Sequence, residues 1–161
     1  MKLNLGCGIY PLKDFINIDS QPLYGDRHDD ILKINLPLGQ ATEMYAGHVI
    51  EHLTWTTIVP ALKHWHDLLM PTGTLTLTFP DFQKAYQLYL DGSTTHESLN
   101  GIVYGNDDVQ TIEGLHKLLV SVPYVLAWLN EAGYSDAQEV DTSPYAVANH
   151  VAWQSIIVAQ A

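Results

Sequence analysis

The sequence predicts an α/β fold with a largely parallel sheet. Short apolar segments with strand character alternate along the chain with segments whose apolar residues have helical spacing. The clearest strand is residues 74–79 (TLTLTF), in which Thr alternates with Leu and Phe. Two closing segments, residues 136–140 and 150–159, predict an antiparallel hairpin at the C-terminal edge. With 161 residues, the chain is most simply one domain over residues 1–161.

The first half is expected to contain four short strands and one helix. The strands are predicted at residues 2–5, 15–18, 30–34 and 43–49, and the helix at residues 57–69. Only six residues lie between Gly8 and Phe15, whereas a parallel crossover usually needs about a dozen or more residues and a helix. The first two strands are therefore either antiparallel, or parallel with the crossover helix reduced to a turn.

The second half is expected to contain two helices separated by a long irregular segment. The helices are predicted at residues 82–90 and 121–132, the second with Ser121 as its N-cap. Asp81 either caps the first of them or reaches the ligand cleft. Residues 91–113 are polar and contain glycines, which is typical of a lid or binding loop. Trp128 and Trp153 are expected in the core.

Composition and charge narrow the class of partner. Eighteen acidic and seven basic residues give a formal net charge of −11, and the bases are scattered along the chain. Nucleic acid and anionic membranes are therefore disfavoured, and small molecules, sugars and neutral peptides stay open. No apolar stretch approaches the ~18–20 residues that span a bilayer, and Met1 and Lys2 lead directly into a strand. We expect a cytoplasmic protein whose single cysteine, Cys7, forms no internal disulfide.

Polar and glycine residues follow the first two predicted strands. In an open α/β sheet, ligands bind beyond the carboxyl ends of the strands. Gly6 and Gly8 allow close approach of the backbone and positive φ angles, and Asp19 can accept hydrogen bonds from two ribose hydroxyls. A third glycine and a following helix, which a dinucleotide pyrophosphate needs, are absent. The pattern favours a nucleoside ligand without a pyrophosphate.

Four motifs together resemble a known family. LNLGCG, FINID, HVIEHL and ALKHWHDLLMPTGTLTLTFPDF are similar, in this order, to the small class I S-adenosylmethionine-dependent methyltransferases of the type 11 group. The resemblance runs from Lys2 to Phe82, about half the chain, and continues more faintly through IVYG, a His-Lys pair and LAWLNEAGY. It implies a Rossmann-like, seven-stranded, mostly parallel sheet with the C-terminal hairpin. It also implies that the N-terminal helix and the first crossover helix are reduced or missing, so that the first two strands are parallel.

The resemblance assigns cofactor-binding roles to residues after four strands. S-adenosylmethionine is the implied cofactor and S-adenosylhomocysteine its product. The methionine part would contact the glycine loop, and the ribose hydroxyls would bind Asp19. The adenine would lie against the segment after the third strand, and the end of the fourth strand would line the cleft. These positions are Leu5, Gly6, Cys7, Gly8, Asp19, Asn35, Leu36, Gly47 and His48.

The adenine side departs from the family pattern. Members often carry an acid near the adenine amino group, but the matching stretch LKINLPL has none. Either Asp29 or Asp30 would have to reach the adenine, or Asn35 substitutes for the acid. The missing N-terminal helix commonly covers the cofactor, so the resemblance also implies a more open site or one closed by a second subunit in a homodimer.

The activity implied is methyl transfer to a small-molecule or sugar acceptor. Tyr104 and His116 lie in or just after the long segment and are the candidate catalytic residues, since a histidine suits proton removal from a hydroxyl or amine. The alternative is a catalytically inactive module that binds S-adenosylmethionine or S-adenosylhomocysteine and acts as a sensor or partner protein. The reduced helices and the missing acid favour this alternative, whereas the intact GCG, Asp19 and HVIEHL favour cofactor binding in either case.

One further motif match comes from another class of enzyme. His48, Glu51 and His52 fit H-x-x-E-H, the inverted zinc-peptidase pattern. That pattern needs both histidines on one helix and a further ligand, but His48 ends a strand and no convincing helix begins before Trp55. A zinc hydrolase is therefore the weakest of the three interpretations, and no metal site is assigned.

Overall fold

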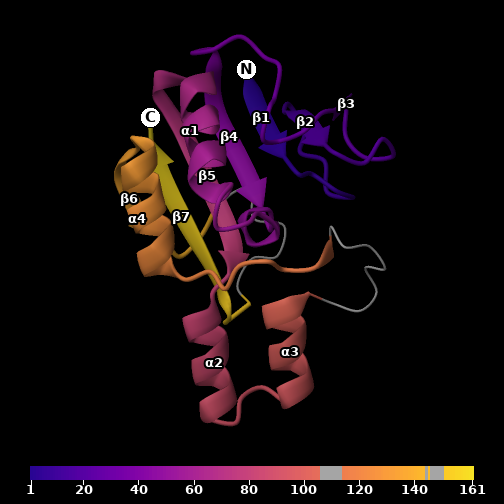
Figure 1. Cartoon of the computed structure of the whole chain (residues 1–161), viewed down its shortest axis with the longest axis vertical. Helices are drawn as coiled ribbons and strands as arrows, with labels where there is room; N and C mark the ends of the chain where they lie inside the picture. The colour runs from indigo at the N-terminus through magenta and orange to yellow at the C-terminus, as the bar shows by residue number, and fades with distance from the viewer. Residues whose placement is uncertain (106–113, 144, 146–150) are drawn as a thin grey trace.

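A seven-stranded sheet forms the centre of the protein in a computed structural model that describes residues 1–105, 114–143, 145 and 151–161 (Figure 1). The strands are β1 (Lys2–Leu5), β2 (Ile16–Asp19), β3 (Arg27–His28), β4 (Ala41–Gly47), β5 (Leu69–Pro80), β6 (Ser135–Glu139) and β7 (Gln154–Gln160). Their order is β3-β2-β1-β4-β5-β7-β6. Strands β1 to β5 are parallel, and β7 is antiparallel to both neighbours. The predicted mostly parallel sheet with a C-terminal antiparallel hairpin is confirmed.

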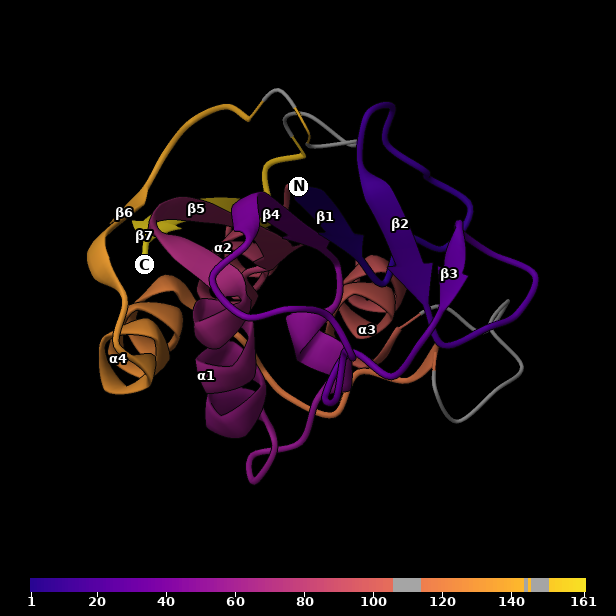
Figure 2. The same cartoon turned by 90° about the horizontal axis from the view of Figure 1, so that it is seen from above.

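Two helices cover one face of this sheet. The helical elements are η1 (Ile50–His52), α1 (Ile58–Leu68), α2 (Phe82–Leu90), α3 (His96–Tyr104) and α4 (Val122–Ala132). Helices α1 and α4 lie side by side on the same face (Figure 2). Each turns an apolar stripe toward the sheet, with Trp65 of α1 and Leu129 of α4 fully buried. The Trp65 Nε1–H donates to the Ile31 carbonyl at 2.8 Å, so the largest core side chain keeps its polar atom paired.

The first connection contains no helix, and its strands are parallel. Leu3 pairs with Ile16 in register, which excludes the antiparallel alternative. The buried Asn17 side chain replaces the helix as the organiser of this connection. Its Oδ1 accepts from the Leu12 N–H and its Nδ2 donates to the Leu12 and Phe15 carbonyls. Asn4 donates to the same Oδ1 at 2.8 Å and ties the turn to the first strand.

The third strand was predicted at residues 30–34, and this is wrong. The strand is the two-residue β3, and residues 30–34 form a turn. Asp30 causes the difference, because its carboxylate accepts the Leu32 N–H and its carbonyl accepts the Lys33 N–H. Ile34 is nevertheless buried, so the apolar pattern that suggested a strand reflects packing of a turn against the core.

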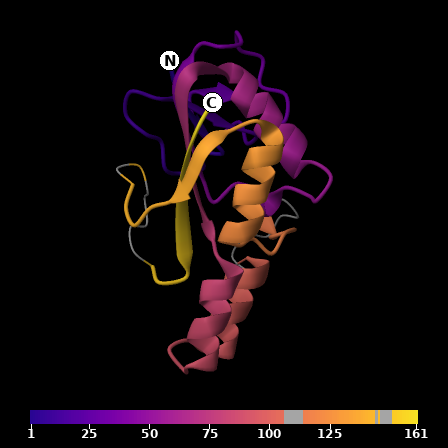
Figure 3. The same cartoon turned by 90° about the vertical axis from the view of Figure 1, so that its left-hand side faces the viewer.

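The segment predicted as irregular, residues 91–113, contains helix α3 in its described part. Thr95 caps this helix by accepting the Ser98 N–H, and none of its side chains is fully buried. Helices α2 and α3 pack against each other and project from the carboxyl end of the sheet (Figures 1 and 3). Asp81 is the N-cap of α2 and accepts the Gln83 and Lys84 N–H groups, which resolves the two alternatives stated for it. Residues 106–113 and 150 of the predicted elements lie outside the described residues.

None of the helices in the described part of the chain is long and apolar enough to cross a membrane.

Candidate active site

A cavity of about 640 Å³ lies beyond the carboxyl ends of β1 and β4. It is open to one side and mostly apolar. Its lining comes from the glycine loop after β1, from the end of β4, and from side chains that reach in from neighbouring strands and turns. The lining residues are Asn4, Gly6, Cys7, Gly8, Ile9, Tyr10, Tyr24, Tyr45, Gly47, His48, His52 and Thr78. We call this space the cofactor cleft, after the role that we propose for it below.

The glycine loop has the conformation that the sequence predicts. Gly6 and Gly8 have φ angles of 59° and 49°, the left-handed region that favours glycine. A Cβ on Gly6 would also lie 2.7 Å from Val49 Cγ2, so the backbone passes too close to β4 for a side chain. The Gly8 N–H donates to Asp19 Oδ2 at 2.8 Å, which fixes the end of the loop to the end of β2.

Five of the nine residues expected at the cofactor line the cleft: Gly6, Cys7, Gly8, Gly47 and His48. Leu5 is fully buried in the core below it. Asp19 is 7% exposed, and its two oxygens accept the Gly8 and Gln21 N–H groups at 2.8 Å each. Asn35 and Leu36 are outside the lining.

The two acids considered for the adenine side are engaged locally. Asp29 Oδ2 accepts from the Arg27 Nε and Nη2 atoms at 3.0 and 2.8 Å. Burial would raise the pKa of Asp29, but the hydrogen bonds from Arg27 and from the Asn35 and Asp30 N–H groups, together with the Arg27 charge, lower the pKa overall. Arg27 also donates to the Asn35 carbonyl at 2.9 Å, so the segment after β3 is held in place by this pair. Asp30 closes the turn described above.

Burial makes Cys7 an unreactive thiol. Desolvation, with a smaller contribution from the charges of Asp19 and Asp26, raises its pKa to about 11. The side chain is 4% exposed and packs in the cleft wall, as expected for a small packed residue.

A second cavity, of about 420 Å³, adjoins the cleft on the side of α3. It is lined by His48, Pro80, Thr94, Glu97, Ser98, Gly101, Ile102, Gly105, His116 and Trp153. His48 is common to the two linings. Of the two candidate catalytic residues, His116 lines this cavity, whereas the Tyr104 side chain is 63% exposed and lines neither space. We call it the acceptor cavity, after the role that we propose for it below.

Sequence reasoning missed Trp153 as a residue of the site. It was expected in the core, but it is only partly buried and lies edge-on to His48, with ring centroids 6.0 Å apart. Trp153 lies just before β7, which is separated from β4 by β5 in the sheet, and no local pattern reveals that it meets the residue that follows β4.

His48 occupies an unusual backbone position between the two cavities. Its φ angle is 55°, which is uncommon for a residue with a side chain. Its Nδ1 donates to Glu51 Oε1 at 3.1 Å, and its Nε2 donates to Gln154 Oε1 at 2.9 Å. Burial would lower the pKa of His48, but the bond to the Glu51 carboxylate and its charge raise it overall. Each ring nitrogen thus faces an acceptor oxygen, one of them on a buried acid.

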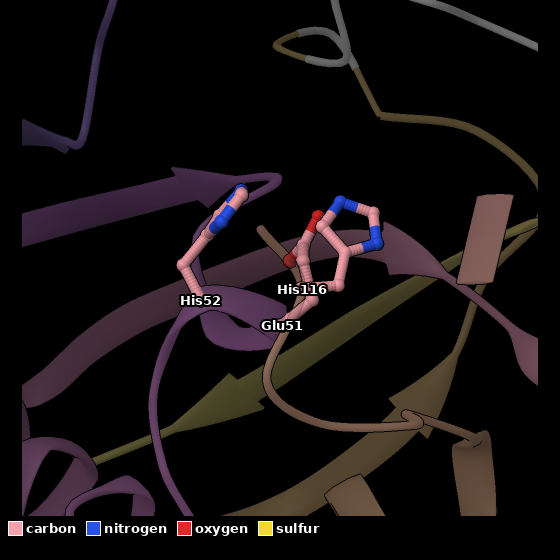
Figure 4. Close-up of side chains that lie close together, drawn as sticks. All are labelled: Glu51, His52 and His116. Atoms are coloured by element: carbon pink, nitrogen blue, oxygen red, sulfur yellow. The ribbon is translucent and has the colours of Figure 1, made fainter. Parts of the chain in front are cut away.

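Glu51, His52 and His116 form a cluster, and Figure 4 shows the carboxylate between the two rings. One ligand atom from each residue lies within 4.8 Å of the other two. The H-x-x-E-H arrangement itself does not form, because His48 precedes the short helix η1 and both of its ring nitrogens have other partners. His116 takes the third place in the cluster.

No protein-family model matches this sequence, and the search of curated proteins finds no match. Solved structures do match over 99% of the chain. They include the CurJ carbon methyltransferase (19% identity, TM-score 0.64) and a S-adenosylmethionine-dependent methyltransferase from Thermotoga maritima (12%, 0.65). PigF, solved with S-adenosylhomocysteine, is a third (18%, 0.62). The chain spans 48%, 81% and 50% of their respective lengths. At these identities the likeness concerns the fold, and the chain has the fold of the class I S-adenosylmethionine-dependent methyltransferases.

Proposed function

We propose that this protein transfers a methyl group from S-adenosylmethionine to a small-molecule or sugar acceptor. The observation that carries the proposal is the junction of two cavities at His48, at the carboxyl edge of the sheet. One cavity has the glycine loop as its wall, and the lining of the other includes the titratable side chains of His48, Glu97 and His116. A donor and an acceptor bound side by side need such a pair of adjoining spaces.

The cofactor cleft fits S-adenosylmethionine in size and chemistry. Its volume of about 640 Å³ lies within the range of about 300–1,000 Å³ common for ligand sites, and its lining is mainly apolar. The glycine loop brings backbone close to the methionine part, and Asp19 lies at the end of β2, where the ribose is expected. Each Asp19 oxygen accepts one N–H and keeps further lone pairs for ribose hydroxyls.

The transfer needs little from the protein beyond positioning and activation of the acceptor. Bound S-adenosylmethionine supplies a methyl group on a sulfonium, and transfer breaks the carbon–sulfur bond while the acceptor atom bonds to the methyl carbon. His116 is the residue that we propose to activate the acceptor. Its Nδ1–H donates to the Ile102 carbonyl at 3.0 Å, which leaves a lone pair on Nε2 in the neutral ring. Burial lowers the pKa of His116, which favours this neutral form.

A binding module without activity is the second candidate. It would need the cofactor cleft but no acceptor cavity with an oriented histidine. The His116 ring is oriented by the Ile102 carbonyl at Nδ1, and its backbone is fixed by the main-chain N–H, which donates to the Tyr104 carbonyl at 3.1 Å. This orientation supports transfer rather than binding alone.

Thermal melting with S-adenosylhomocysteine, and with NAD as the control ligand, tests the cofactor. A ligand at about 100 times its Kd stabilises the fold by about 2.7 kcal/mol, so Tm should rise by about 5–11 °C for a chain of this size. We expect the shift with S-adenosylhomocysteine only. No shift at millimolar ligand would overturn the proposal.

Methyl transfer is tested with labelled S-adenosylmethionine and a panel of hydroxyl and amine acceptors. The variant His116→Ala should lose about 10²–10⁴-fold in turnover, as is typical when a group that activates the acceptor is removed, while its affinity for S-adenosylhomocysteine stays the same. His28→Ala, which changes an exposed histidine on β3, is the matched control and should keep full turnover. Binding of S-adenosylhomocysteine without transfer to any acceptor would favour the inactive module.

A further inference from the structure

Glu51 is a buried acid with one oxygen that the described residues do not satisfy. The residue is 0% exposed, and its Oε1 accepts from His48. Among the described residues, Oε2 has no hydrogen-bond partner. A buried carboxyl oxygen without a partner costs free energy, so such an atom points to a ligand that binds it.

The two neighbouring histidines each present a free ring nitrogen. The Nδ1 of His52 lies 3.2 Å from the Leu115 carbonyl, and the Nδ1 of His116 lies 3.0 Å from the Ile102 carbonyl. A carbonyl can only accept, so both Nδ1 atoms carry the hydrogen, and Nε2 of each neutral ring keeps its lone pair. Histidines that bind metals typically donate their other ring N–H to a backbone carbonyl in this way.

The backbone brings these side chains together from distant parts of the chain. The Glu51 carbonyl accepts the N–H groups of Lys117 and Leu118 at 2.7 and 3.2 Å, which pins this segment against η1. His116 thereby lies beside His52, with ring centroids 5.0 Å apart and the rings nearly perpendicular. The cluster is built into the fold by main-chain bonds rather than by a chance approach of mobile side chains.

We infer that Glu51, His52 and His116 bind a divalent transition metal ion of the zinc class. Two imidazoles and one carboxylate are a ligand set of catalytic zinc sites, which keep a fourth position open. Zinc ligands at about 2.1 Å in tetrahedral geometry lie about 3.4 Å apart. The three ligand atoms lie within 4.8 Å of one another, so rotamer adjustments of about 1 Å close the site. The formal net charge of −11 attracts cations rather than anions to the protein as a whole.

The place of the cluster assigns a role to the metal, and this step rests on the proposed function. His52 lines the cofactor cleft and His116 lines the acceptor cavity, so the ion lies at their junction. A metal there binds the oxygen of a hydroxyl acceptor and lowers its pKa, and the proton leaves to solvent. The oxygen then bonds to the methyl carbon as the carbon–sulfur bond breaks. His116 thus activates the acceptor as a metal ligand, and the acceptor class is hydroxyl compounds.

Calorimetric titration of the metal-free, tag-free protein with Zn²⁺ tests the site. We expect one Zn²⁺ per chain in the wild type. His52→Ala and Glu51→Gln should weaken this binding by more than about 100-fold, because even the loss of an outer-shell partner costs about 10- to 100-fold. The control is His28→Ala, which removes an exposed histidine from β3 and should bind as the wild type does. His52 is half-buried, so its variant gives an answer even if Glu51→Gln fails to fold.

The outcomes separate this inference from the proposed function. Absence of one-to-one Zn²⁺ binding, or the same affinity in wild type and His52→Ala, overturns the metal site even if S-adenosylhomocysteine still binds. Zn²⁺ binding without any effect of S-adenosylhomocysteine on Tm would leave the metal site and overturn the methyltransferase. If turnover with hydroxyl acceptors is detected, a chelator should abolish it and added Zn²⁺ should restore it. Transfer that is insensitive to the chelator would overturn the role assigned to the metal.

Discussion

Asp19 is expected to contribute to both stability and cofactor affinity, and Asp19→Asn separates the two. Each carboxylate oxygen accepts one partly buried backbone N–H, from Gly8 and from Gln21. An asparagine has one oxygen, so one of these N–H groups would face an amide donor and lose its partner. A buried donor without a partner costs about 1–3 kcal/mol. For a chain of this size, Tm should therefore fall by about 2–12 °C.

Asp26→Asn is the matched control for this change. Asp26 also accepts a backbone N–H, but it uses a single oxygen. Its Oδ2 accepts from both the Asn17 N–H and the Asn17 side-chain amide, at 3.0 and 2.8 Å. An asparagine at this exposed position keeps that oxygen, so the loss in unfolding free energy should stay below about 1 kcal/mol. Urea denaturation of both variants measures the difference.

The affinity of Asp19→Asn for S-adenosylhomocysteine tests the ribose contact. Hydrogen bonds to a charged acceptor contribute about 1.5–3 kcal/mol, which corresponds to an affinity about 10- to 150-fold weaker. Loosening of the glycine loop would also weaken binding, so the 2′-deoxy analogue is titrated in parallel. The wild type should prefer the ribose compound, and the variant should bind the two alike. An unchanged preference in the variant would refute the ribose contact and leave Asp19 with a structural role alone.

Two further predictions concern the loop that follows β1. Gly8→Ala should lower the free energy of unfolding by about 1–2 kcal/mol, because only the positive φ at this position opposes a side chain. Gly6→Ala should lose about 1–3 kcal/mol more, because its Cβ would also clash with Val49. Equal losses for the two variants in urea denaturation would contradict the close approach at Gly6. Cys7, with a pKa of about 11, should be about one-thousandth thiolate at pH 8 and should react with iodoacetamide about tenfold faster for each pH unit up to that pKa. Rapid alkylation at pH 8, measured by mass spectrometry of the folded protein, would show that the thiol is not buried as described.

The parts of the site that the sequence could predict are those encoded next to strand ends. An apolar run marks where β1 ends, and Gly6 and Gly8 follow it directly, so their place at the cleft needs no knowledge of distant residues. Gly47 and His48, at the end of β4, were placed at the cleft by the family resemblance. In a parallel sheet these ends meet at one edge, and local patterns therefore suffice to place them together.

Other parts were hidden because local patterns mislead or are silent. Residues 30–34 look like a strand since Ile34 packs in the core, yet the Asp30 side chain closes a turn there. Helix α3 has no fully buried side chain, so it leaves no apolar stripe for a sequence pattern to detect. The contact between η1 and His116 depends on main-chain bonds from the Glu51 carbonyl, which every residue type can make. No residue type or sequence pattern specifies such a bond.

The backbone conformation of His48 connects a strand end that the sequence predicted with the cluster that the sequence did not reveal. A left-handed backbone costs a residue with a side chain about 1–2 kcal/mol relative to glycine, and glycine would end β4 without that cost. The strain is offset by what the ring does, since it donates to Glu51 on one side and to Gln154 of β7 on the other. Glu51 is thereby held with Oε1 satisfied, while Oε2 has no hydrogen-bond partner among the described residues and the carboxylate lies beside His52 and His116. The unfavourable backbone at the strand end is thus explained by the orientation of a buried carboxylate, at the point where the two cavities meet.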